Sequence, residues 1–186
     1  MPKAKPVRFE SDTQLFATVG MFLHEWLYLE TAVNRLLARM IRAPDMHASI
    51  LGPNIEFRKK LNILRVGARA SPHLAALKKA KAVAGLVTAA GGLYADRNNL
   101  VHYPWRRSED GKLVILRTQA VDELVDARMV WTSKQMAWKV VECARVFNEL
   151  FDIATAIKPV DSKQTNWLKV ITEIEDNNET ASQQGT

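Results

Sequence analysis

Apolar residues in the N-terminal part of the chain recur at alternating spacings of four and three residues. This pattern predicts one long amphipathic helix packed in a bundle. Its stripe consists of Leu15, Val19, Phe22, Trp26, Leu29, Val33, Leu36 and Met40. Ser11 and Gln14 have the spacing of a capping box at its start. Ala43-Pro44 ends the helix, because a residue before proline avoids the α region.

A second helix is expected from about Asn54 to Ala70, after a short helical turn over Asp45 to Leu51 that Gly52-Pro53 ends. Its apolar face carries Phe57, Leu61, Leu64 and Ala68. A different face carries Arg58, Asn62, Arg65 and Arg69 at the same kind of spacing.

A third helix opens with Ser71-Pro72, a cap followed by proline at the first helical position. It runs to about His102, where Tyr103-Pro104 ends it. Its middle contains Gly85, Gly91 and Gly92, each of which costs about 1 kcal/mol relative to alanine. We therefore expect close helix packing there, or a break near Gly91-Gly92.

After Tyr103-Pro104, the spacing of apolar residues no longer fits a helix. Trp105 to Ser108, a Glu109-Asp110-Gly111 turn and Leu113 to Thr118 predict a small β-hairpin. A short helix is expected over Val121 to Met129. Thr132 and Gln135 have capping-box spacing for a last long helix, which Lys158-Pro159 ends. The apolar stripe of this helix consists of Met136, Val140, Cys143, Phe147, Leu150, Ala154 and Ile157.

These elements predict an all-α, antiparallel helical bundle with a small β-hairpin inserted before the last long helix. We divide the chain into a basic N-terminal arm (1–10), the bundle domain (11–157) and a C-terminal tail (158–186). In the tail, Trp167, Ile171 and Ile174 predict a short amphipathic helix. The polar end from about Asp176 is expected to be disordered.

Composition narrows the function classes. The 186 residues suffice for one domain, and the net charge of +6 favours a polyanionic partner. We expect no secretory signal and no membrane association, since no apolar run approaches the about 20 residues of a membrane span. The single cysteine, Cys143, lies on an apolar stripe and excludes an internal disulfide. A cytoplasmic location is expected.

Most signatures of catalytic and cofactor sites are missing. The chain has no phosphate-binding glycine loop, no His-Glu-x-x-His and no Gly-x-Ser-x-Gly. Its four histidines, at positions 24, 47, 73 and 102, show no metal-ligand spacing. We therefore expect neither a metal nor a cofactor.

The end of the third predicted helix, Asp96-Arg97-Asn98-x-x-x-His102, carries the candidate chemistry. On a helical wheel, Arg97 lies about 40° from the core position Leu93, so its charge must be paired or must face an interface or a cleft. His102 follows Asn98 by one turn, where the helix dipole favours the imidazolium. An arginine and a histidine so spaced suit phosphoryl chemistry. The alternative is a structural arginine paired with Asp96, Glu25 or Glu30, beside a solvated histidine.

Arg97-Asn98-x-x-x-His102 resembles the Arg-Asn-x-x-x-His signature of the HEPN superfamily. The helical context over residues 11–157 agrees with this resemblance. It implies a metal-independent endoribonuclease whose two copies face a shared cleft in a homodimer. His102 would be the acid/base group, Arg97 would hold the scissile phosphate, and Asn98 would orient the site. The RNA 2′-hydroxyl would attack its own phosphate, leaving a 2′,3′-cyclic phosphate and a 5′-hydroxyl.

The resemblance also implies a role as a toxin or in phage defence, with an antitoxin or regulatory protein as a partner. An alternative is a non-catalytic HEPN module that binds a nucleotide, an RNA or a protein. A helical DNA-binding regulator would fit the charge, but the chain lacks a clear helix-turn-helix signature.

Further residues are candidates for RNA contact or for support of the motif. Arg58, Arg65 and Arg69 form either an RNA-backbone track or an ordinary solvated face. Arg106 and Arg107 are candidates to flank the cleft, and Trp105 to stack a base. Glu25, Glu30, Asp96 and Tyr103 are candidate supporting residues, and Trp26 is assigned to the core.

Overall fold

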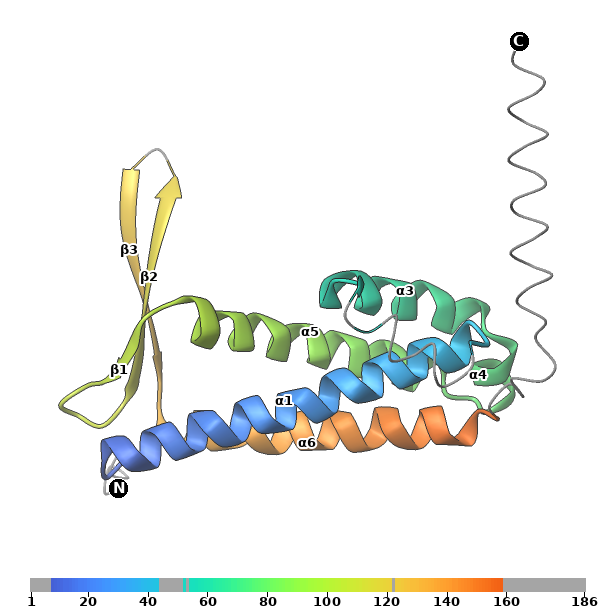
Figure 1. Ribbon diagram of the computed structural model, residues 1–186, viewed down its shortest axis with the longest axis horizontal. Coiled ribbons are helices and arrows are strands. Elements are labelled where there is room, and N and C mark those ends of the chain that lie inside the picture. Colours follow the sequence, from blue (N-terminus) through green and yellow to red (C-terminus); the bar gives the residue numbers. More distant parts are fainter. Residues whose placement is uncertain (1–7, 44–51, 53, 122, 159–186) are drawn as a thin grey trace, which may run out of the picture.

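The computed structural model describes residues 8–43, 52, 54–121 and 123–158, so the predictions for 44–51 and for the tail lie outside it. Five helices are described, together with a three-stranded antiparallel sheet at one end of the bundle (Figure 1). The helices are α1 (Asp12–Met40), α3 (Phe57–Ala70), α4 (Pro72–Ala76), α5 (Ala80–His102) and α6 (Ser133–Ala156). No helix in the described ranges combines the length and the apolar character needed to span a lipid bilayer.

The bundle is not antiparallel throughout. α1 makes its most extensive contact with α6, and the two run in the same direction (Figure 1). Tyr28 packs on Phe147, and further along both helices the Arg35 guanidinium lies 4.6 Å from the ring centroid of Phe151. The prediction of an antiparallel bundle is therefore wrong for this pair. The reason is that α5 and the sheet return the chain to the end of the bundle where α1 began.

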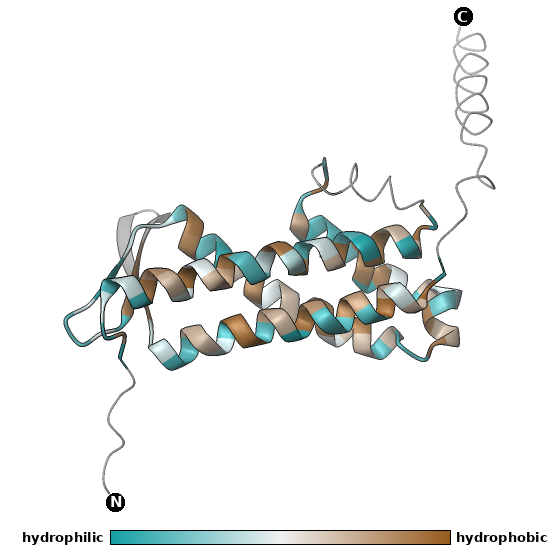
Figure 2. Ribbon diagram, turned by 60° about the horizontal axis from the view of Figure 1, so that its bottom comes forward, coloured by the Kyte–Doolittle hydropathy of each residue, from teal (hydrophilic) through white to brown (hydrophobic). Residues whose placement is uncertain are grey.

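The predicted stripe of α1 forms the core. Its members are buried except Met40, which is half-buried, and Trp26 packs against Phe57 as a core residue. Brown, apolar segments are also visible along the bundle helices in Figure 2. Met21 of α1 and Val141 of α6 are exposed apolar residues. The core prediction for Trp26 is confirmed.

Both ends of α1 differ in detail from the prediction. Ser11 Oγ accepts from the Gln14 N–H, but Gln14 Oε1 accepts from the N–H of Glu10 rather than from that of Ser11. The helix ends at Met40, before Ala43-Pro44. There Arg42 adopts a φ of 59°, and the Ala43 N–H donates to the Ala38 carbonyl. This is a Schellman motif, which satisfies the last carbonyls without proline.

The predicted second helix starts at Phe57 instead of Asn54, and the third is divided in two. The break lies after α4, where Lys78 has a φ of 53°, and not at Gly91-Gly92. α5 continues through both glycines. α3 packs on α5 at Gly91, where a Cβ would lie 3.8 Å from Leu61 Cδ1, an ordinary contact; among the described residues, nothing lies within 4 Å of a Cβ at Gly85 or Gly92. The helices therefore pack together at Gly91, but the approach is not close enough to require glycine at any of the three positions.

The β insertion has three strands: β1 (Trp105–Arg107), β2 (Leu113–Val121) and β3 (Glu123–Trp131). The hairpin of β1 and β2 is confirmed, whereas the helix expected over Val121 to Met129 is wrong. β2 continues past Thr118, so the next segment can satisfy its backbone groups as a partner strand. Alternate apolar residues at 125, 127, 129 and 131 also fit a strand, although the same window fits a helix.

The last helix begins as predicted. Thr132 and Gln135 form the capping box. The helix ends at Ala156, and its C-cap is Ile157, the residue before Lys158. The predicted stripe is buried except Val140 and Phe147, which are half-buried, and Val146 and Ile153 join it.

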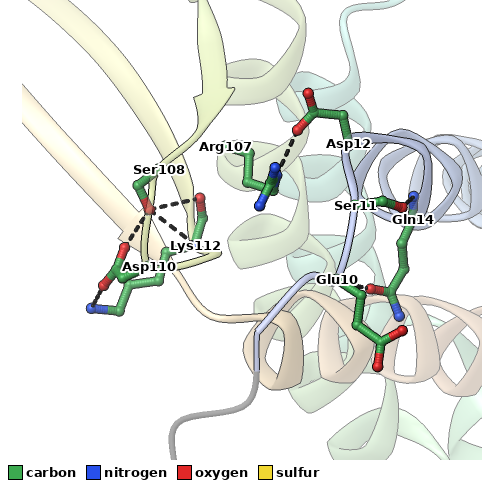
Figure 3. A network of polar contacts seen from close by, with 8 residues as sticks. All are labelled: Glu10, Ser11, Asp12, Gln14, Arg107, Ser108, Asp110 and Lys112. Atoms are coloured by element: carbon green, nitrogen blue, oxygen red, sulfur yellow. Dashed lines mark hydrogen bonds and ion pairs between the residues drawn. The ribbon is translucent and has the colours of Figure 1, made fainter.

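The start of α1 is tied to the β1–β2 turn, an arrangement that we call the N-terminal joint (Figure 3). The Phe9 N–H donates to the Gly111 carbonyl at 2.9 Å, and Arg107 Nε donates to Asp12 Oδ1 at 2.6 Å. Gly111 has a φ of 70°, and a Cβ on it would lie 2.7 Å from Arg8 Cβ. Only glycine fits this position. Arg8 and Phe9 of the predicted arm thus lie against the turn.

Candidate functional site

A cleft of about 690 Å³ lies between α3 and α5, and we call it the α3–α5 cleft. From α3 it is lined by Arg58, Leu61, Asn62 and Arg65. From α5 and the residue after it, the cleft is lined by Gly91, Tyr94, Ala95, Asn98, Asn99, His102 and Tyr103. Both sets recur every three or four residues, which places each on one face of its helix. The cleft therefore joins the predicted arginine face to the predicted motif.

Two contacts fix how the two helices align. The Phe57 and Tyr94 rings lie 5.2 Å apart, and Leu61 lies opposite Gly91. Residue numbers therefore rise along α3 as they fall along α5, so the helices are antiparallel. Arg58, next to Phe57, is the α3 arginine closer to the end of the cleft that holds His102. Arg65 lies about 10 Å further along, since the helix rises 1.5 Å per residue.

The cleft is basic. Among the residues that the structure describes, its lining contains no Asp or Glu, and α3 has five basic residues and no acidic one. Within the described part of the chain, neither Arg58 nor Arg65 forms an ion pair; Arg65 Nη1 donates to Asn62 Oδ1 at 3.5 Å. Unneutralised arginines beside amides and a histidine suit an anionic ligand.

The motif residues are divided between the cleft and its support. His102 is exposed, Asn98 is half-buried, and both line the cleft. Arg97 is half-buried but does not line it; its Nη1 donates to Asn98 Oδ1 at 3.1 Å. Asn99, only 9% exposed, lines the cleft although the sequence analysis did not select it. An amide beside the core position Leu100 was the signal that could have identified it.

Most of the candidate supporting residues interact with side chains outside the motif. Glu30 accepts from Lys60 Nζ at 3.3 Å, and Asp96 pairs with Lys139 of α6. Glu25 lies on α1 close enough to Cys143 to influence that thiol. Among the described contacts, none of these carboxylates pairs with Arg97. Of the four candidates, Tyr103 is the one that lines the cleft.

The remaining candidates for RNA contact lie outside the cleft lining. Arg69 and Arg106 are exposed on α3 and β1. Arg107 belongs to the N-terminal joint, where it binds Asp12. Trp105 packs on Phe16, and its Nε1–H donates to the Leu100 carbonyl at 3.1 Å. This contact holds β1 against the end of α5, so the Trp105 ring has a structural role.

Two further kinds of site are a cluster of metal ligands and a reactive cysteine, and the described residues contain neither. No group of three or more His, Cys, Asp or Glu side chains gathers there as metal ligands. Burial, followed by the charges of Glu25 and Glu142, raises the pKa of Cys143 to about 12. Its thiol therefore stays protonated at neutral pH and packs as an apolar side chain.

No family model matches the chain, and the searches of curated proteins and of solved structures find no significant match. A functional assignment therefore depends on the chemistry of the α3–α5 cleft.

Proposed function

We propose that this protein is a metal-independent endoribonuclease of HEPN type. One observation carries the proposal: the α3–α5 cleft joins His102 and Asn98 to two arginines, and its described lining contains no acidic side chain. A histidine supplies proton transfer near neutral pH, and arginine supplies charge for a phosphate. Among the described residues, the lining has no carboxylates, which suits a polyanionic backbone and offers a divalent ion no anionic oxygen ligand.

In the proposed reaction, the RNA 2′-hydroxyl attacks the adjacent phosphorus as the bond to the 5′-oxygen breaks. The 2′-hydroxyl loses one proton and the departing 5′-oxygen gains one. His102 moves these protons, Asn98 orients the phosphate, and arginine offsets its charge. The products are a 2′,3′-cyclic phosphate and a 5′-hydroxyl.

The proposal includes a homodimer in which two clefts face each other. Exposed apolar side chains beside the cleft support it, since Val66 on α3 is 72% exposed and Val101, next to His102, is 47% exposed. The setting we propose is a cytoplasmic toxin or phage-defence protein, held in check by an antitoxin or regulatory partner.

The test is an RNA cleavage assay in EDTA with total tRNA and a structured messenger RNA. Wild type should cut and leave cyclic phosphates, while His102→Ala should lower the rate by at least about 100-fold, the typical contribution of a general acid/base group. His24→Ala is the matched control, because His24 is exposed on α1, outside the cleft. Equal cleavage by purified His102→Ala protein would refute the proposal.

A second candidate function is a non-catalytic HEPN module that binds RNA or a nucleotide in the same cleft. The engagement of Arg97 with Asn98 favours it, since this arginine is absent from the cleft lining. Saturable RNA binding without cleavage, by wild type and His102→Ala alike, would support this function instead.

A further inference from the structure

The two arginines that line the cleft differ from Arg97 in what they contact. Arg58 and Arg65 line the cleft and, among the described residues, meet no carboxylate. Arg97 does not line the cleft and donates to Asn98. We infer that Arg58 and Arg65 bind two different phosphates of one RNA strand, whereas Arg97 is a positioning residue that orients the Asn98 amide. This inference rests on the proposed ribonuclease function.

The spacing of the arginines sets the path of the strand. Arg58 and Arg65 are seven residues apart on one helix, hence about 10 Å apart along its axis. We assign them to separate phosphates of one strand that runs along α3. Because Arg58 is the closer to the His102 end, it binds the scissile phosphate. Arg65 binds a phosphate further along the strand.

Arg97 acts through Asn98. Its Nη1 donates to Asn98 Oδ1 at 3.1 Å, which occupies the acceptor of the amide. The group that Asn98 then offers to the cleft is its Nδ2 amide, a donor suited to a phosphate oxygen. Loss of Arg97 frees the amide to rotate, so it should impair cleavage without removing a phosphate contact.

The experiment separates binding from cleavage with two probes. Binding is measured by fluorescence anisotropy over a series of KCl concentrations. Its probe is a single-stranded 2′-O-methyl oligoribonucleotide, which lacks the attacking hydroxyl. Cleavage is measured as kcat and KM on a dinucleotide and on a longer oligoribonucleotide. The variants are Arg58→Gln, Arg65→Gln and Arg97→Gln. Arg69→Gln is the matched control, since Arg69 is exposed on the same helix but outside the cleft lining.

The α3 arginines should behave as backbone contacts. Arg58→Gln and Arg65→Gln should each weaken binding about tenfold. Each should also reduce the salt slope by about 0.7, the value for one phosphate of a single strand. Arg58→Gln should lower kcat/KM on both substrates. Arg65→Gln should do so only on the longer one, which alone reaches it.

Arg97→Gln should lower kcat and leave the salt slope unchanged. Asn98→Ala should do the same, and the double variant should be no worse than either single one, because the two residues act as a unit. Circular dichroism melts check that each variant is folded.

Three results would overturn the inference: no binding of the methylated strand by wild type, equal losses in Arg69→Gln, or a salt slope that changes only in Arg97→Gln. A His102-dependent nuclease insensitive to Arg58→Gln and Arg65→Gln would likewise refute it, while the proposed function stands. Arginine-dependent binding without cleavage would uphold the two phosphate contacts and refute the nuclease.

Discussion

The N-terminal joint and the α3–α5 cleft both place arginine beside polar groups, but among the described residues the arginine is paired with a carboxylate only in the joint. In the joint, Arg107 meets Asp12, and Ser108, Asp110 and Lys112 bind one another across the turn. In the cleft, within the described residues, Arg58 and Arg65 meet no carboxylate. In the joint, the charged side chains pair with one another, whereas in the cleft the arginines keep a positive charge that is available to a ligand. A region of the second kind is where a ligand is expected.

The largest expected change in stability comes from breaking the joint at Gly111. Gly111→Ala should lower the free energy of unfolding by about 2–3 kcal/mol, because the added Cβ meets Arg8 at 2.7 Å in a left-handed backbone. Urea unfolding measures this loss. Gly92→Ala is the control: no described residue lies within 4 Å of a Cβ there, so this variant should raise the free energy of unfolding by up to about 1 kcal/mol. Equal stability of the two variants would contradict the close approach at the turn.

A smaller loss is expected where α3, one wall of the cleft, is held against α1. Lys60 is only 1% exposed, and its ammonium binds Glu30, whose side chain is 36% exposed. Glu30→Gln should lower the free energy of unfolding by about 2 kcal/mol, since it leaves a buried charge without its counterion. Adding Lys60→Met should recover most of that loss in the same urea titration. A double variant as unstable as Glu30→Gln would show that the charge is not the cause.

Removing a positive charge from the cleft should instead raise the free energy of unfolding. Arg65 and Arg69 are four residues apart on α3, and like charges at this spacing destabilise a helix by about 0.2–0.5 kcal/mol. Arg65→Gln should therefore raise the free energy of unfolding by this amount in low salt, and high salt should remove the gain. Arg69→Gln should give a smaller gain or none, because Arg69 lies in the last turn of α3, where the helix dipole favours a positive charge. If only Arg65→Gln also loses RNA binding, the cleft retains this charge for its ligand.

The smallest expected effect is the pH response of the joint. Hydrogen bonds from Lys112 and then Ser108 hold the pKa of Asp110 below its ordinary value of 3.8. The carboxylate therefore stabilises the fold above that value, and its contribution disappears as the pH falls through the lower, folded-state pKa. Asp110→Asn should be less stable than wild type at pH 7, and the difference should shrink in strong acid. Urea midpoints at both pH values measure it.

Long helices could be predicted because their apolar periods persist for many turns. The apolar stripe of α1 is of this kind. The start of α6 could be predicted for a different reason, because its capping box needs only two residues at the right spacing. β3 could not, since its apolar residues over nine positions fit a period of two as well as a helix, and the partner strand decides between them. Likewise, the break after α4 depends on Lys78 adopting a left-handed conformation. A lysine in the sequence gives no indication of a positive φ, so this break could not be predicted.

The same distinction applies to the cleft. His102, Asn98, Arg58 and Arg65 lie there as helical spacing suggests, since short-range geometry fixes which face each residue occupies. The place of Arg97 could not be predicted in this way. Its long side chain reaches either side of its own position, and the Asn98 amide decides where the guanidinium lies.

The parallel pairing of α1 with α6 has a consequence for how the protein is made. These helices form the most extensive contact in the bundle, yet one opens the domain and the other closes it. Such long-range contacts slow folding, because much chain must be ordered before they form. During translation, α3 becomes available to pack on α1 early, but the part of the α1 surface that α6 covers stays exposed until α6 is synthesised. A nascent chain that stalls before Ser133 therefore keeps that apolar surface exposed, which favours aggregation or chaperone binding.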